Sequence, residues 1–172
     1  LARYRLVLWA KAEPPDDSAI TLEQYSGFLH LLLKNIIYLD FSIWGPNWHR
    51  LLKWLRFPGI IQKKDGTFER REMYGPSNID LFFKSWNCAE TGFIMAGAAN
   101  LGSLQLYRRF IEELHTTYSE GCWPLLYQAH NRCWLELAPR VLERAAPGQL
   151  DAFDPTRPFD FVVPALTTED SF

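Results

Sequence analysis

Four side chains of types that commonly bind zinc lie in the second half of the chain: His115, Cys122, His130 and Cys133. His130 and Cys133 are three residues apart, so they would share one face of a helix and could bind a metal ion together. The other two are separated by a predicted helix end and a turn, and the spacing as a whole matches no standard zinc site. We therefore favour two buried thiols and two partly exposed histidines, and we predict no metal and no cofactor.

Cys122 lies in a Gly-Cys-Trp sequence that resembles the end of the nucleophile motif of papain-like enzymes. A thiol at a helix start can be acidified by the helix dipole and a nearby histidine, which makes it a nucleophile. The rest of the motif is absent, because Ser119 and Glu120 precede the cysteine and no histidine follows His130. A thiol enzyme is therefore not the favoured interpretation.

Carboxylates gather in the proline-containing C-terminal stretch, at Asp151, Asp154 and Asp160. Paired acids could bind a hard cation or share the roles of general acid and base. Solvated turn residues explain them more simply. The sequence also contains no glycine-rich phosphate loop, HExxH helix, GxSxG elbow or dinucleotide-binding motif. We therefore predict a protein without catalytic residues.

Basic residues are concentrated between positions 47 and 72. This stretch has seven basic and three acidic residues, about +4, whereas the rest of the chain carries about −6. The cations could contact phosphates, and exposed rings could stack on bases. The alternative is a solvated hairpin edge that lysine and arginine protect from aggregation. The candidate nucleic-acid-binding residues are Trp48, Arg50, Lys53, Trp54, Arg56, Lys63, Lys64, Arg70 and Arg71.

The composition indicates one folded domain. A length of 172 residues is close to the usual size of a single domain, and seven Trp, seven Tyr and twelve Phe provide apolar surface for a core or a partner. The net charge of −2 draws the whole chain neither to nucleic acid nor to anionic lipid, so any such attraction is local. Three cysteines suit a reducing compartment, so we expect an intracellular protein without disulfides. No membrane insertion and no signal peptide are predicted.

Helical patterns dominate the first half of the chain. Residues 4–11 favour a helix, and Thr21 with Gln24 forms a capping box that begins a largely buried helix. Its apolar face is Leu22, Tyr25, Leu29, Leu32, Leu33 and Ile36. A second helix is predicted from Pro46 to about Arg56, ended by Pro58 and Gly59. The Asp-Gly pair at 65–66 then predicts the one hairpin.

Four further helical segments are predicted in the remainder of the chain. Ser77 with Asp80 resembles another capping box, and Ser103 is a good N-cap for an amphipathic helix after a connection at 96–102. The core face of that helix is Leu104, Tyr107, Ile111, Leu114 and Tyr118. A helix over 123–145 contains Pro139, which should kink or divide it. A short helix is expected from Pro158.

These patterns together predict a mainly α protein: a single helical domain of about five to seven helices with one small β-hairpin. Residues 1–150 are expected to form the helical domain, with the hairpin near 60–72. Residues 151–172 are expected to form a proline-rich C-terminal segment with a short helix. Because the chain begins with Leu1 rather than Met, we also expect it to be part of something longer.

Short segments distributed along the chain resemble an uncharacterised protein family of dinoflagellate genomes, found in retroelement-like reading frames. They are Asp40-Phe-Ser-Ile-Trp-Gly-Pro, Tyr74-Gly-Pro-Ser-Asn-Ile, Tyr127-Gln-Ala-His-Asn-Arg, Arg157-Pro-Phe and Glu169-Asp-Ser-Phe. In similar proteins this region precedes a basic Cys/His-rich segment, a layout that resembles gag-like polyproteins. The resemblance implies an assembly domain, although no Cys/His-rich segment lies within these 172 residues, and it supplies no catalytic residues.

The sequence therefore favours a non-catalytic assembly or nucleic-acid-associated module, gag-like and belonging to a mobile-element polyprotein. Its expected partners are another protein or further copies of itself, together with RNA or single-stranded DNA. The main alternative is an accessory structural subunit that exposed aromatic residues hold inside a larger protein complex. An unrecognised thiol or metal enzyme is a third alternative.

Overall fold

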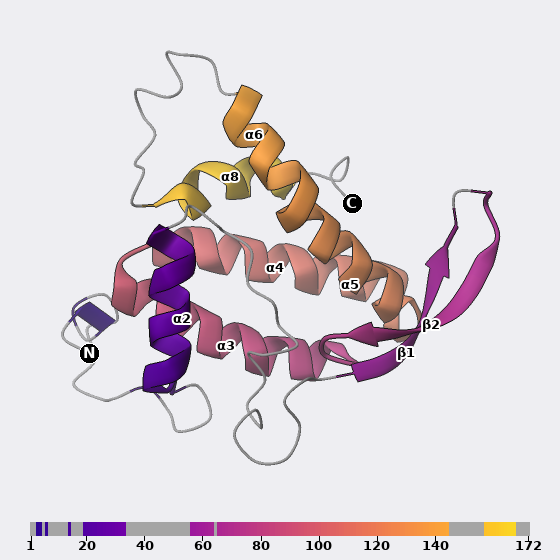
Figure 1. The fold of residues 1–172 in the computed structure, drawn as a ribbon, viewed down its shortest axis with the longest axis horizontal. Helices are drawn as coiled ribbons and strands as arrows, with labels where there is room; N and C mark the ends of the chain where they lie inside the picture. Colours follow the sequence, from indigo (N-terminus) through magenta and orange to yellow (C-terminus); the bar gives the residue numbers. More distant parts are fainter. Residues whose placement is uncertain are drawn as a thin grey trace.

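The helices α3 (Ile79–Ala96) and α4 (Leu101–Tyr118) run side by side through the middle of the protein, and a two-stranded hairpin projects at one side (Figure 1). This computed structural model describes residues 3, 4, 6, 14, 19–33, 56–63, 65–144 and 157–167. The predicted class is confirmed: the protein is a small, mainly helical domain with one antiparallel hairpin. At the N-terminus, Arg3, Tyr4 and Leu6 are helical, in agreement with the expected helix.

Helix α2 (Leu22–Leu33) begins with the predicted capping box. The Thr21 N–H donates to Gln24 Oε1 at 3.1 Å, and the Gln24 N–H donates to Thr21 Oγ1 at 3.3 Å. The predicted burial of this helix is wrong for Leu22 and Leu29, which are 83% and 37% exposed. Helix α2 packs beside α3, and its Gln24 is buried. A broad apolar stripe predicts that a helix packs against other elements. It does not determine how much of the helix surface those elements cover.

The hairpin pairs β1 (Arg56–Gln62) with β2 (Phe68–Tyr74). The turn lies at the predicted Asp-Gly pair, and Gly66 has a φ of 82°. The Gly66 N–H donates to the Lys63 carbonyl at 3.0 Å, and the Lys63 N–H donates to the Thr67 carbonyl at 2.8 Å. Of the helix predicted from Pro46, only Arg56 is among the described residues, and it begins β1 instead. Pro58 and Gly59 lie inside β1, because an edge strand tolerates a residue without an N–H.

Helix α3 is capped one residue later than predicted. Its N-cap is Asn78, whose side chain accepts the Leu81 N–H at 2.9 Å, rather than Ser77. Gly97 ends the helix in the left-handed conformation, with a φ of 70°. Helix α4 begins at Leu101, after an N-cap at Asn100 instead of Ser103.

Asn100 owes this position to contacts with the segment that precedes and begins α8 (Pro158–Leu166). Its N–H donates to both oxygens of the Asp160 carboxylate, at 2.8 and 3.0 Å, and its side-chain oxygen accepts from Arg157 at 2.8 Å. Arg157 also donates to the Gly97 carbonyl at 3.2 Å. These bonds fasten α8 to the corner between α3 and α4. Tertiary contacts of this kind override local capping preferences.

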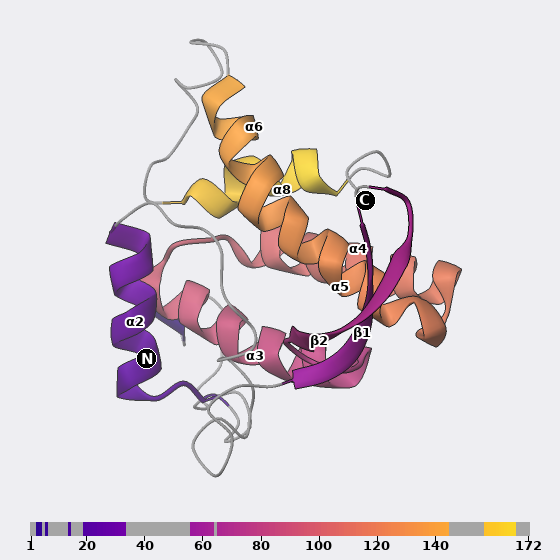
Figure 2. The ribbon, with the colours of Figure 1, turned by 45° about the vertical axis from the view of Figure 1, so that its right-hand side comes forward.

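Pro139 divides the predicted helix at 123–145 without breaking it. The segments α5 (Trp123–Arg132) and α6 (Ala138–Arg144) are joined by a π turn, Cys133–Leu137, and form one continuous run in Figures 1 and 2. In this turn the Ala138 N–H donates to the Cys133 carbonyl, five residues earlier. A proline lacks an N–H, and its ring collides with the carbonyl four residues before it. The wider π turn accommodates both effects.

The core is aromatic and lies between α3, α4, α5 and α8. The predicted face of α4 is confirmed for Leu104, Tyr107, Ile111 and Leu114, whereas Tyr118 is 55% exposed. The helix from Pro158 is also confirmed, and it adds four buried side chains to the same core: Phe159, Val162, Val163 and Leu166.

Candidate interaction surface on the hairpin

The four zinc-type side chains do not form a metal site. No group of three or more His, Cys, Asp or Glu side chains within the described ranges is arranged to hold a metal ion. His130 is buried among aromatic rings, with Phe82 at 5.1 Å and Tyr127 at 5.7 Å between ring centroids. Its Nδ1 lies 2.7 Å from the Tyr107 hydroxyl oxygen. The expectation that His130 is partly exposed is therefore wrong: it is part of the core, where burial lowers its pKa to about 3.

The two cysteines of that set differ in environment. Cys133 is buried, and burial raises its pKa to about 12, so this sulfur remains a protonated thiol at neutral pH. Cys122 is half-buried at the wall of a cavity that is described below. Of the three candidate carboxylates, Asp160 binds the Asn100 N–H, while Asp151 and Asp154 lie outside the described residues.

The basic candidates that can be placed all belong to the hairpin. Arg56, Lys63, Arg70 and Arg71 are exposed on its two strands and beside its turn. The remaining candidates lie outside the described residues: Trp48, Arg50, Lys53, Trp54 and Lys64.

The two faces of the hairpin have different environments. Side chains alternate along each strand, and directly opposite residues share a face. One face contacts α5 near Phe57 and Met73: Phe57 is 5% exposed, and its ring meets Tyr127 edge-on at 6.0 Å. The opposite side, which we call the outer face, consists of Arg56, Pro58, Ile60, Phe68, Arg70, Glu72 and Tyr74, all exposed.

Aromatic and cationic groups therefore share the outer face. Phe68 is 65% exposed and Tyr74 is 52% exposed. The Arg56 guanidinium lies 5.2 Å from the centre of the Tyr74 ring, and its Nη1 is 3.5 Å from Glu72 Oε2. Lys63 pairs with Glu69 at 3.0 Å. Two of the three acidic residues between positions 47 and 72, Glu69 and Glu72, are therefore paired with cations.

A shallow hollow of about 360 Å³ lies on the hairpin. Its lining is Arg56, Phe57, Pro58, Arg70, Arg71 and Glu72. Neither Arg70 nor Arg71 forms an ion pair with another described residue. A hollow with three guanidinium groups and one carboxylate attracts anions, and the planar guanidinium suits phosphate oxygens.

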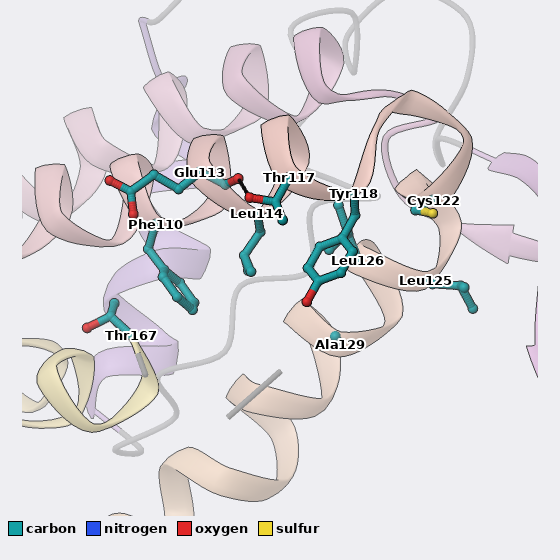
Figure 3. A pocket seen from close by; sticks show the side chains of 10 residues that line it. All are labelled: Phe110, Glu113, Leu114, Thr117, Tyr118, Cys122, Leu125, Leu126, Ala129 and Thr167. Carbon is teal, nitrogen blue, oxygen red and sulfur yellow. Dashed lines mark hydrogen bonds between the residues drawn. The ribbon is translucent and has the colours of Figure 1, made fainter. Parts of the chain in front are cut away.

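A larger cavity, of about 570 Å³, lies between α4 and α5, beyond the end of α8 (Figure 3). Its lining is Phe110, Glu113, Leu114, Thr117, Tyr118, Cys122, Leu125, Leu126, Ala129 and Thr167. Leu125 is 47% exposed. Sequence reasoning missed this cavity. The available signal was limited to three apolar side chains, Tyr118 at the end of α4 and Leu125 and Leu126 in the first turn of α5.

Among the helices described, none is both long enough and apolar enough to cross a membrane. Comparison of the chain with protein-family models, curated proteins and solved structures found no match.

Proposed function

We propose that this chain is a non-catalytic, nucleic-acid-associated assembly module, and that the hairpin is its contact surface for RNA or single-stranded DNA. The observation that carries the proposal is the hollow lined by Arg56, Arg70 and Arg71, with exposed Phe68 and Tyr74 on the same hairpin. The resemblance to gag-like, retroelement-associated proteins supports only the assembly part of this proposal.

The two kinds of side chain would act differently. Guanidinium groups neutralise phosphates and release counterions, which provides affinity without sequence preference. Exposed rings offer a stacking surface for unpaired bases, which favours single strands over duplexes. Because the chain outside 47–72 carries about −6, repulsion would confine the contact to the basic region.

The first prediction concerns salt-dependent binding. Wild-type protein should bind a fluorescent single-stranded oligonucleotide with an affinity that falls as salt rises. Changing Arg70 and Arg71 together to alanine should weaken binding and reduce the slope of log K against log [salt] by about 1.4, since each single-strand phosphate contact contributes about 0.7. Fluorescence anisotropy over a series of salt concentrations measures both quantities.

A matched control changes Arg109 and Arg140 to alanine, because both are exposed on helices away from the hairpin. This variant should keep the wild-type slope. Absence of binding at low salt, or an equal loss of slope in both double variants, would contradict the proposal.

The cavity between α4 and α5 favours a second candidate function, an accessory subunit that binds an apolar segment of another protein. Its wall combines Phe110, Leu114 and Leu126 with the half-exposed Leu125. A cavity of about 570 Å³ falls within the usual volume range of ligand pockets.

We predict that this cavity is accessible to a neutral apolar probe. Nile red should show enhanced fluorescence with the wild-type protein, and Ala129→Trp, which places an indole in the cavity, should reduce the enhancement several-fold. Ala165→Trp, at an exposed position of α8 outside the cavity lining, is the control and should leave it unchanged. Equal fluorescence with Ala129→Trp and the wild-type protein would exclude this site.

A further inference from the structure

We infer that the edge of β2 opposite β1 pairs with the same edge of a second copy of this chain, so that two hairpins form one four-stranded antiparallel sheet across a two-fold axis. This inference rests on the proposed function and deepens its assembly part, because it names the partner and the contacting strand. Three properties of the hairpin favour this pairing: the backbone groups that point outward, the edge that can accept another strand, and the register that places opposite charges together.

The turn determines which backbone groups point outward. The Lys63 N–H donates across the hairpin to the Thr67 carbonyl. In an antiparallel pair, hydrogen-bonded and non-hydrogen-bonded positions alternate. Counting from this bond, Glu69, Arg71 and Met73 bond inward to β1, while Phe68, Arg70 and Glu72 direct their N–H and C=O groups away from it. By the same alternation, the backbone groups of Pro58 and Ile60 in β1 point away from β2.

The outward edge of β1 is obstructed. Pro58 has no N–H to donate there, and the Ile60 carbonyl accepts a hydrogen bond from Gln128 Nε2 of α5 at 2.6 Å. The edge of β2 differs, because six of its seven residues are exposed. Figure 1 shows the hairpin projecting from the helices. Of the two edges, β2 is therefore the one on which another strand can be added.

The sequence of β2 matches itself in one antiparallel register. When the two strands are centred on Arg71, outward residues face outward residues, as the hydrogen bonds require. Arg70 of each copy then lies opposite Glu72 of the other, and Phe68 lies opposite Tyr74. These pairs join opposite charges and aromatic rings, both favourable across strands.

Neighbouring registers are less favourable. A shift of two residues, the smallest that keeps outward groups facing each other, places Arg70 opposite Arg70 or Glu72 opposite Glu72. In the register centred on Arg71, the only like charges that face each other are the two Arg71 side chains, at the two-fold axis. Glu72 would lie between Arg56 of its own hairpin, already 3.5 Å away, and Arg70 of the second copy. Pairing would also extend the outer face into one surface that carries the arginines of both chains.

The primary test is the mass of the protein in solution by sedimentation velocity over a range of concentrations. Wild-type protein should reach a dimer of the 20.0 kDa chain. Arg70→Glu should shift the equilibrium to the monomer, because each new glutamate faces Glu72, and the double variant Arg70→Glu/Glu72→Arg should restore the dimer. Arg109→Glu, a charge reversal on the exposed side of α4, should leave the dimer intact.

A second measurement tests the register independently of charge. In a Cys122→Ser background, Arg71→Cys should form a disulfide-linked dimer under mild oxidation, since equivalent residues meet at the axis within disulfide reach. Arg70→Cys should form far less, because its counterpart is residue 72. Arg70→Pro removes one outward N–H, leaves the inward bonds of the hairpin in place, and should give a monomer with an unchanged circular dichroism spectrum.

A wild-type chain that stays monomeric at high concentration would overturn the inference, as would a dimer that persists in both Arg70→Glu and Arg70→Pro. The salt-titration experiment separates these results from the proposed function. A monomer that binds the oligonucleotide would refute self-pairing alone, whereas a β2-dependent dimer that binds none would refute the nucleic-acid contact alone.

Discussion

Changing Phe82 to alanine should lower the free energy of unfolding by about 3–5 kcal/mol, the cost of deleting a large ring from a packed core. Phe82 is completely buried, and its ring contacts those of Trp86, Trp123 and His130, at 6.2, 5.4 and 5.1 Å between centroids. It therefore joins α3 to α5 at the centre of the aromatic core. Urea denaturation followed by tryptophan fluorescence measures the change.

The matched control is the same substitution on the surface. Phe68 is 65% exposed on the hairpin, so Phe68→Ala should change stability by no more than about 0.5 kcal/mol. If the two alanine variants lost stability equally, the arrangement of core and hairpin described above would be wrong.

The second large effect is a loss of stability in acid caused by His130. In the unfolded chain its pKa is near the ordinary 6.5, whereas burial in the folded protein lowers it to about 3. Between pH values of about 3 and 6.5, the His130 side chain binds a proton in the unfolded chain but not in the folded protein. The free energy of unfolding should therefore fall as the pH drops from about 6.5 to about 3, by up to about 1.4 kcal/mol per pH unit from this residue. Above pH 6.5 the contribution is complete and constant.

Urea denaturation at a series of pH values, in parallel with His130→Gln, isolates this effect. Glutamine does not titrate and keeps a polar group near the Tyr107 hydroxyl, so the variant should show a shallower acid dependence. The comparison matters because burial raises the pKa of Glu90, whose protonation favours the folded state as the pH falls and so opposes the effect of His130. Identical pH profiles for the two proteins would contradict the assignment.

Local chemistry explains which parts of the fold could be predicted. The capping box at Thr21, the Asp-Gly turn at 65–66 and the apolar face of α4 each depend on residues within a few positions of one another. Their signals are complete within a short stretch of sequence, and the structure confirms them except for Tyr118 at the end of the α4 face.

The parts that could not be predicted depend on distant residues. Arg56 begins a strand because residues near Tyr74 pair with it, and Asn100 precedes α4 because Asp160 accepts its N–H. The composition of residues 47–72 shows where the basic residues lie in the sequence. Their division between the two faces of the hairpin follows from its packing on Tyr127 and Gln128. The cavity near Leu125 likewise exists only after α4 and α5 have come together.

The bonds that fasten α8 to the corner between α3 and α4 also couple distant parts of the chain. Because the Asn100 amide hydrogen is held by Asp160, it can exchange with solvent only after that contact opens. Release of α8 would uncover Phe159 from the centre of the molecule and free the start of α4 at the same moment. Residues 97–100 and 157–166 should therefore open as one cooperative unit, although more than fifty positions of sequence separate them.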